Sequence, residues 1–238
     1  MVVILPADEL DEEVWLTLIS LGAEKPEGWT LVGAQMVALH GFEAGRDRIR
    51  VSADADVLVD VRVIPAATRE FSSHLQQLGF GLEGVSPEGV GHRFVRGVVK
   101  IDVLAPDGLG DRADVMTVPP ARTVRVPGGS QALRRSEMIR VQLRDRRGEI
   151  PRPNLTGALL VKARAVDVDD SQDVQLRDLA FLLSLVEDPD KLREEMTDAE
   201  RRWLRKHAEL RERGHPTWGT LSLEQADDGQ AALLLLTR

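Results

Sequence analysis

The sequence contains no cysteine, and this absence removes several kinds of chemistry at once. Without thiols the chain has no disulfide, no thiolate zinc site and no cysteine nucleophile. The five histidines never fall at a zinc-binding spacing such as HExxH. Zinc chemistry is therefore not expected.

Long apolar runs and an excess of positive charge are also missing. The first residues, "MVVILPADEL", have no basic start and too short an apolar run for a signal peptide, and the final "AALLLL" is far shorter than the roughly 20 residues that cross a bilayer. The net charge is −8, from 31 Lys and Arg against 39 Asp and Glu, which is not the overall charge of a nucleic-acid binder. We expect a cytoplasmic protein with no membrane partner.

What is present is an ordinary globular composition, 42% hydrophobic over 238 residues, with a change of character along the chain. Strand and helix patterns mix up to about residue 150, and from residue 155 the pattern is helical almost throughout. The sequence predicts an α+β fold with a mixed β-sheet core and flanking helices in 1–150, followed by a helical domain in 151–238. The expected elements are a helix over 9–21, a strand ending at Gly33, a helix stopping at Gly41, a strand over 56–64, a helix over 66–80 ended by Gly79, a hairpin over 92–108 turning near Gly97, strands over 122–126 and 137–143, and a helix over 173–189 stopped by Pro189.

Two aspartates, Asp54 and Asp56, begin an apolar Val-rich run in "RVSADADVLVDV". In a strand, residues i and i+2 point to the same face, so the two carboxylates would lie side by side and repel each other. A magnesium ion between them would relieve that repulsion. The alternative is a solvated strand end that happens to be acidic. A calcium EF-hand loop is excluded, since its sixth and twelfth positions would be Val59 and Pro65.

Two further features flank this pair. Gly33 stands between a predicted strand and a helix start, where it could let the backbone approach a phosphate or simply form an ordinary turn. Asp102 is a single acid inside an apolar strand, and burying an unpaired carboxylate is costly. Its partner would be either a base, such as a nearby arginine or Lys100, or a metal ion shared with the other acids.

The order of these motifs resembles a known group of enzymes. Gly33-Ala34, then Asp54-x-Asp56, then Asp102 looks like the nucleotidyltransferase superfamily of the DNA polymerase β type. The pattern R-x-S-x-D-x-D from Arg50, the strand "IDVLAPD" and the helical "GALLVKARAV…QLRDLAFLL" resemble most the AbiEii-type nucleotidyltransferases, toxins of toxin–antitoxin and abortive-infection systems. The resemblance runs from about residue 33 to about residue 186, with Ala34 where the family usually has Gly or Ser.

This resemblance implies a site. It would hold two Mg²⁺ ions and an NTP, and Asp102 would also act as, or orient, the base for the acceptor hydroxyl. From the residues alone, Lys162 on an apolar helix could instead extend its amine to solvent, and Asp178 could pair with a neighbouring base such as Arg164. The implied metal ligands are Asp54, Asp56 and Asp102, and the implied nucleotide-binding residues are Gly33, Ala34, Arg50, Ser52, Lys162 and Asp178.

The expected function is magnesium-dependent transfer of a nucleoside monophosphate from NTP to an acceptor. Residues 122–147 hold eight arginines against two acids, which is either a solvated hairpin or a basic surface for an RNA acceptor, with a tRNA 3′ end first by the resemblance. A toxin of this kind would also have a cognate antitoxin protein. Two alternatives stay open: a non-catalytic module that binds a nucleotide or a partner, and a small-molecule nucleotidyltransferase such as those that inactivate aminoglycoside antibiotics.

Overall fold

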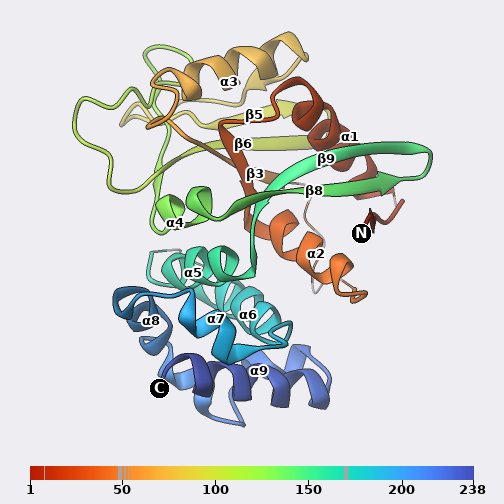
Figure 1. The fold of residues 1–238 in the computed structure, drawn as a ribbon. Coiled ribbons are helices and arrows are strands. Elements are labelled where there is room, and N and C mark those ends of the chain that lie inside the picture. Colours follow the sequence, from red (N-terminus) through yellow and green to blue (C-terminus); the bar gives the residue numbers. More distant parts are fainter. Residues whose placement is uncertain (8, 48–49, 51, 53, 169–170) are drawn as a thin grey trace.

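The computed structural model describes residues 1–238 apart from 8, 48–49, 51, 53 and 169–170 (Figure 1). The strands are β1 (Val3–Ile4), β2 (Trp29–Val32), β3 (Asp54–Val59), β4 (Gly81–Leu82), β5 (Arg93–Arg96), β6 (Val99–Pro106), β7 (Arg125–Val126), β8 (Ser136–Leu143) and β9 (Arg146–Pro153). The helices are α1 (Glu9–Glu24), α2 (Gly33–Glu43), α3 (Ala67–Gln77), α4 (Gly129–Arg134), α5 (Leu155–Val166), α6 (Gln172–Leu183), α7 (Pro189–Glu194), α8 (Asp198–Arg205) and α9 (Leu223–Leu236), with short 3₁₀ helices η1 (Ala208–Arg211) and η2 (Pro216–Thr220).

The acidic strand β3 is an interior strand of the larger sheet. The order of this sheet is β2-β3-β6-β5-β4, with β7 added to the end of β6. β3 and β6 are parallel, while β2 and β5 run antiparallel to them. Figure 1 shows α1 and α3 on one side of this sheet and α4 and α5 on the other. Because helices cover both sides, β6 is buried along nearly its whole length, which explains its almost continuous apolar sequence.

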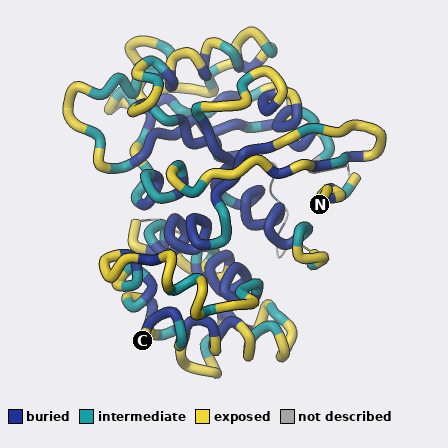
Figure 2. Tube along the Cα trace, in the orientation of Figure 1, coloured by how far each residue is buried: buried dark blue, intermediate teal, exposed yellow. Residues whose placement is uncertain are grey.

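A second, three-stranded sheet has the order β1-β8-β9. The sequence does not predict β9, which contains Pro151 and Pro153. Proline cannot donate to a β-ladder, but β9 lies at the edge of its sheet, where the missing donor costs little. The β8–β9 hairpin ends in an exposed tip (Figure 2).

After Pro153 the described chain is helical, and α5 and α6 form the layer next to the sheets (Figure 1). α2 packs on both α5 and α6 and so joins the two parts. This packing is close: a Cβ on Gly41 of α2 would lie 2.8 Å from the Phe181 ring of α6. The mixed α+β fold predicted from the sequence is confirmed, while the division into domains at residue 150 stays a prediction.

Several predicted boundaries were wrong, for local reasons. The strand expected over 56–64 ends at Val59, since the Asp60 carboxylate accepts the backbone N–H of Arg62 at 3.1 Å and turns the chain. The helix expected over 173–189 ends at Leu183, and Pro189 instead begins α7. As predicted, α3 ends shortly before Gly79, and Gly97 lies in the turn of the β5–β6 hairpin. In the described chain, no helix is both long and apolar enough to cross a membrane.

Candidate functional site

The three predicted acids come together on adjacent strands. Asp54 and Asp56 are two residues apart on β3 and therefore share a face. The parallel pairing of β3 with β6 sets Asp56 directly beside Asp102. Side chains of paired residues point to the same side of a sheet, so the three carboxylates gather over the β3–β6 pair.

Asp102 has a partner, and the partner is an arginine. Arg93 lies directly opposite Asp102 in the β5–β6 hairpin, and its Nε and Nη2 atoms donate to the two carboxylate oxygens, both at 2.8 Å. His92 Nε2 lies 3.9 Å from the same carboxylate. Asp102 itself is almost fully buried. Of the two partners that the sequence left open, a base therefore holds Asp102 in this structure.

Asp56 lies in an environment that disfavours its charge. Burial, and then the negative charges of Asp102 and Asp54, raise the pKa of Asp56 to about 6, although Lys162 and Arg50 pull it back. A carboxylate in this position gains from any cation that comes close to it.

Gly33 touches this carboxylate directly. It is the first residue of α2 and has a positive φ of 69°. A Cβ built on it would lie 1.8 Å from Asp56 Oδ2, so no side chain fits. Asp56 thus stands against the N-terminal end of α2, whose first turn receives no side-chain cap. Backbone N–H groups at such an end are suited to anions.

A cavity of about 870 Å³ opens beside Gly33 and Asp56. Its walls come from both parts of the chain, because β2, β3, β6 and β7 form one side and α5 and the start of α6 the other. It is lined by Val32, Gly33, Asp56, His92, Leu104, Val124, Arg125, Val126, Pro127, Val161, Lys162, Ala165, Val168, Ser171 and Gln175. A space of this size can take a nucleotide.

Lys162 of α5 is linked to Arg50, which lies before β3, through a shared partner, Asp178 of α6. The Lys162 amine donates to Asp178 Oδ2 at 2.7 Å and to Gln175 Oε1 at 2.9 Å. Arg50, from the segment before β3, donates from Nε and Nη2 to the same carboxylate at 3.1 and 3.0 Å. Burial alone would raise the pKa of Asp178, but the two cations lower it below its ordinary value.

This ion triad of Arg50, Lys162 and Asp178 corrects two sequence interpretations. Lys162 is buried and ion-paired, so it does not extend its amine to solvent. Asp178 pairs with Lys162 and Arg50 rather than with Arg164, which binds Asp167 instead. Lys162 also lines the cavity next to Asp56 and so places a positive charge in the cavity wall.

Two of the predicted nucleotide-binding residues, Ser52 and Ala34, lie outside the described lining of the cavity. The Ser52 hydroxyl accepts the backbone N–H of Asp54 at 3.3 Å, and the Ser52 carbonyl accepts a hydrogen bond from Gln35. Ala34 is buried behind Gly33. Neither Ser52 nor Ala34 is one of the described residues that line the cavity. Their predicted contact with a nucleotide stays a prediction.

The arginine-rich segment 122–147 does not form one surface. Arg125 lines the cavity. Arg144 pairs with Glu12 of α1 at 2.7 Å, and Arg147 bonds Gln142 within its own hairpin. These contacts tie much of the segment to α1 and to the exposed hairpin, which favours the solvated-hairpin interpretation for that portion.

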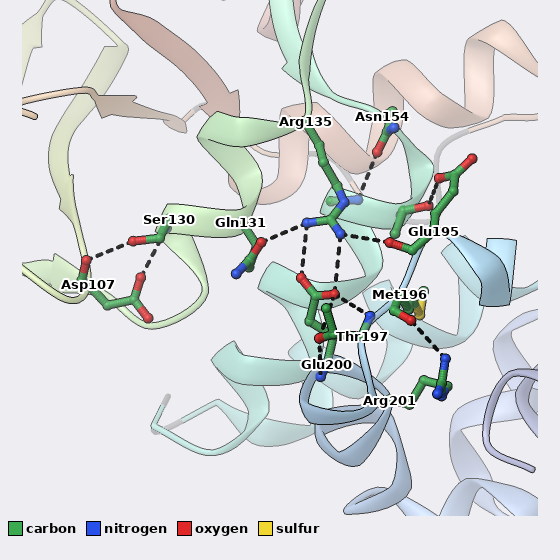
Figure 3. Close-up of polar contacts among 12 residues, drawn as sticks. Asp107, Ser130, Gln131, Arg135, Asn154, Glu195, Met196, Thr197, Glu200 and Arg201 are labelled. Carbon is green, nitrogen blue, oxygen red and sulfur yellow. Dashed lines mark hydrogen bonds and ion pairs between the residues drawn. The ribbon is translucent and has the colours of Figure 1, made fainter. Parts of the chain in front are cut away.

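Arg135 of this segment has a structural role (Figure 3). Its guanidinium donates to Gln131 at 2.7 Å, to the carbonyl of Glu195 at 3.0 Å and to the carboxylate of Glu200, whose nearest oxygen is 3.1 Å away. Glu200 also closes the capping box of α8 with Thr197. Arg135 therefore links α4 to the C-terminal helices and is not available to hold an RNA.

The carboxylates match the donor chemistry of magnesium unequally. Carboxylate oxygens are hard ligands, and Asp54 and Asp56 share one face of β3, so these two residues would hold the ion. Asp102 does not fit as it stands, because Arg93 occupies both of its oxygens. Within the described residues, no three His, Cys, Asp or Glu side chains are placed to hold a metal ion together.

Comparisons with known proteins address the fold. No family model matches the chain, and no curated protein sequence matches it. Among solved structures, the chain is similar to an antigenic nucleotidyltransferase-like protein from Paracoccidioides brasiliensis, with a TM-score of 0.52, 14% identity and coverage of 94% of both chains. The chain therefore has a nucleotidyltransferase-like fold. Similarity at this identity extends to the fold alone.

Sequence reasoning missed Arg93, His92 and Arg125 as site residues. A signal for Arg93 was present: a hairpin that turns near Gly97 and pairs Arg96 with Val99 must also pair Arg93 with Asp102. The register of the hairpin thus predicts Arg93 as the partner of Asp102. Arg125 carried no such signal, since its position depends on a two-residue strand that pairs with the end of β6.

Proposed function

We propose that this chain is a magnesium-dependent nucleotidyltransferase, which moves a nucleoside monophosphate from an NTP to an acceptor hydroxyl. The observation that carries the proposal is the contact between Gly33 and Asp56 in the wall of the cavity. A glycine without room for a Cβ, at a helix start that touches a carboxylate, is suited to bring a phosphate chain and a cation together.

The chain's own residues would divide the work as follows. The first N–H groups of α2 would bind the terminal phosphates, and Lys162, held by Asp178, would place positive charge on the other side of the cavity. Asp54 and Asp56 would hold the ion, which when bound supplies positive charge to the phosphate oxygens. The helical wall formed by α5 would limit access of water.

The reaction is a displacement at the α-phosphorus. The acceptor oxygen forms a bond to phosphorus, the bond to pyrophosphate breaks, and the acceptor hydroxyl releases its proton to solvent water. The family resemblance gives that proton to Asp102. The two hydrogen bonds from Arg93 occupy both oxygens of the Asp102 carboxylate, so we assign Asp102 an electrostatic role instead.

The acceptor is proposed to be RNA, bound through Arg125 and Arg134. Arg125 lines the cavity, where its guanidinium also donates to the carbonyls of Leu109 and Gly110 at 3.0 and 3.4 Å, and Arg134 is exposed at the end of α4. Arginine binds phosphate through its planar fork, and such contacts weaken as salt rises. The toxin role and a cognate antitoxin are carried only by the resemblance to AbiEii-type proteins, and they are tested by whether expression arrests growth and Asp56→Asn relieves the arrest.

The deciding experiment offers each of the four α-phosphate-labelled NTPs, with Mg²⁺, to total RNA, to protein and to aminoglycosides. Label on RNA that is lost in Asp56→Asn supports the proposal, and Arg125→Glu with Arg134→Glu should then lower RNA labelling. Label on an aminoglycoside or on protein would replace RNA by that acceptor. If a folded chain binds NTP but labels no acceptor, the chain is a non-catalytic nucleotide-binding module.

A further inference from the structure

Arg93 stands among the acids in the place where a cation is expected. Its Nε and Nη2 atoms bind both oxygens of Asp102 at 2.8 Å. The same Nη2 lies 3.7 Å from Asp54 Oδ2, and Nε lies 3.9 Å from Glu83 Oε2. One guanidinium thus faces three carboxylates.

The backbone holds this arrangement in place. Arg93 and Asp102 are directly opposed residues of the β5–β6 hairpin, so the sheet itself sets the distance between them. Paired hydrogen bonds between guanidinium and carboxylate are among the stronger contacts in proteins, and the Asp102 side chain is only 7% exposed. Removing Arg93 would leave the nearly buried Asp102 carboxylate without this partner, which is unfavourable. A metal ion would have to displace Arg93 to reach Asp102.

We propose that the Arg93 guanidinium replaces one of the two metal ions that the nucleotidyltransferase fold leads one to expect. This inference rests on the proposed function. In it, Asp54 and Asp56 bind the single ion of the site, while Asp102 binds Arg93 and no metal. The arginine supplies a fixed positive charge beside the ion, but it offers no coordination site for a water molecule or a hydroxyl group.

The test is the number of Mn²⁺ ions that the full chain binds, counted by electron paramagnetic resonance of the free ion during a titration. The chain should bind one ion, Asp56→Asn should bind none, and Asp102→Asn should still bind one. Arg93→Gln frees Asp102 and should gain a second ion, and adding Asp102→Asn to that variant should remove it. Arg93→Lys keeps a charge at this position and should bind one ion.

The matched control is Arg96→Gln. Arg96 lies on the same strand but on the opposite face, where it stacks on Phe80 and bonds the carbonyl of Leu78. The Arg96→Gln variant should bind one ion, like the parent chain. Thermal unfolding checks that each variant is folded.

Two ions on the parent chain, or a loss of its ion in Asp102→Asn, would overturn the inference and leave the proposed function standing. A folded Arg93→Gln that still binds one ion would overturn it as well. If neither the parent chain nor Arg93→Gln binds Mn²⁺, the metal-dependent function itself fails, and the inference falls with it.

Discussion

Replacing Gly33 by alanine should damage the site more than the fold. At φ +69° an L-residue costs about 1–2 kcal/mol, since its Cβ crowds the following carbonyl. The added methyl would also lie 1.8 Å from Asp56 Oδ2, against about 3.4 Å for ordinary contact, so the carboxylate must retreat by about 1.6 Å. Displacements of about 1 Å at a reacting centre can cost about 100-fold in rate.

Gly45→Ala separates the two effects. Gly45 has nearly the same φ, +67°, but a Cβ there would meet nothing within 4 Å. It should show the backbone cost alone, a fall in Tm of about 2–8 °C for a chain of this size. Gly33→Ala should show that fall or a larger one, and in addition lose about 100-fold in nucleotidyl transfer and bind Mn²⁺ more weakly.

Thermal unfolding, Mn²⁺ titration and labelled-NTP turnover on both variants form the assay. The result that would refute the reasoning is a Gly33→Ala variant that binds Mn²⁺ and turns over NTP as well as Gly45→Ala does. The contact between Gly33 and Asp56 would then have no part in the chemistry.

The remaining predictions concern charge. Because the folded chain holds a proton on Asp56 up to about pH 6, whereas the unfolded chain loses it near 3.8, stability falls as pH rises between those values. In urea unfolding, Asp56→Asn should therefore stabilise the ion-free chain by about 2–3 kcal/mol at pH 8 and by less near pH 4. Its turnover should fall by about 10³ or more. Equal stability gains at the two pH values would contradict this. Lys162→Met should lower the unfolding free energy by about 2–3 kcal/mol, and no more, because Asp178 keeps Arg50 as a second partner. NTP binding measured by calorimetry should weaken as well. Unchanged NTP affinity would limit Lys162 to a structural role. Arg135→Ala should lower the unfolding free energy by about 1–3 kcal/mol and leave Mn²⁺ binding intact. As the control, Arg134→Ala changes an exposed neighbour and should alter the unfolding free energy by less than about 0.5 kcal/mol. Similar costs for the two variants would argue against the contacts of Arg135 drawn in Figure 3.

Short-range features of this fold were readable from the sequence. Gly79 ends α3 with a positive φ of 86°, and Gly97, at φ 60°, turns the β5–β6 hairpin, both as predicted. Each depends on a conformation that glycine adopts at low cost, so the signal is local. The shared face of Asp54 and Asp56 is likewise a direct result of strand periodicity.

Long-range partners were not readable in the same way. Arg50 and Asp178 are 128 residues apart, and only the packing of α6 beside the segment before β3 brings them together. The local pattern suggested Arg164 for Asp178, but Arg164 points to Asp167 and lies over the Trp203 ring. The edge strand β9 was not predicted for a related reason. A strand with two prolines is tolerated only at certain places in a sheet, and the sequence does not show where the strand lies.

The parallel pairing of β3 with β6 also has a consequence for the order of events in folding. Two parallel strands cannot join through a tight turn, and here some 40 residues, including all of α3, separate them. Contacts between residues so distant in the chain form slowly, because the loop between them must be closed first. The acidic strand gains Asp102 and Arg93 as neighbours only when this closure is complete, and gains Lys162 only after α5 has docked. The site is thus expected to be among the last parts of the molecule to mature, with amides of β3 and β6 acquiring protection from hydrogen exchange later than those of the α5–α6 pair.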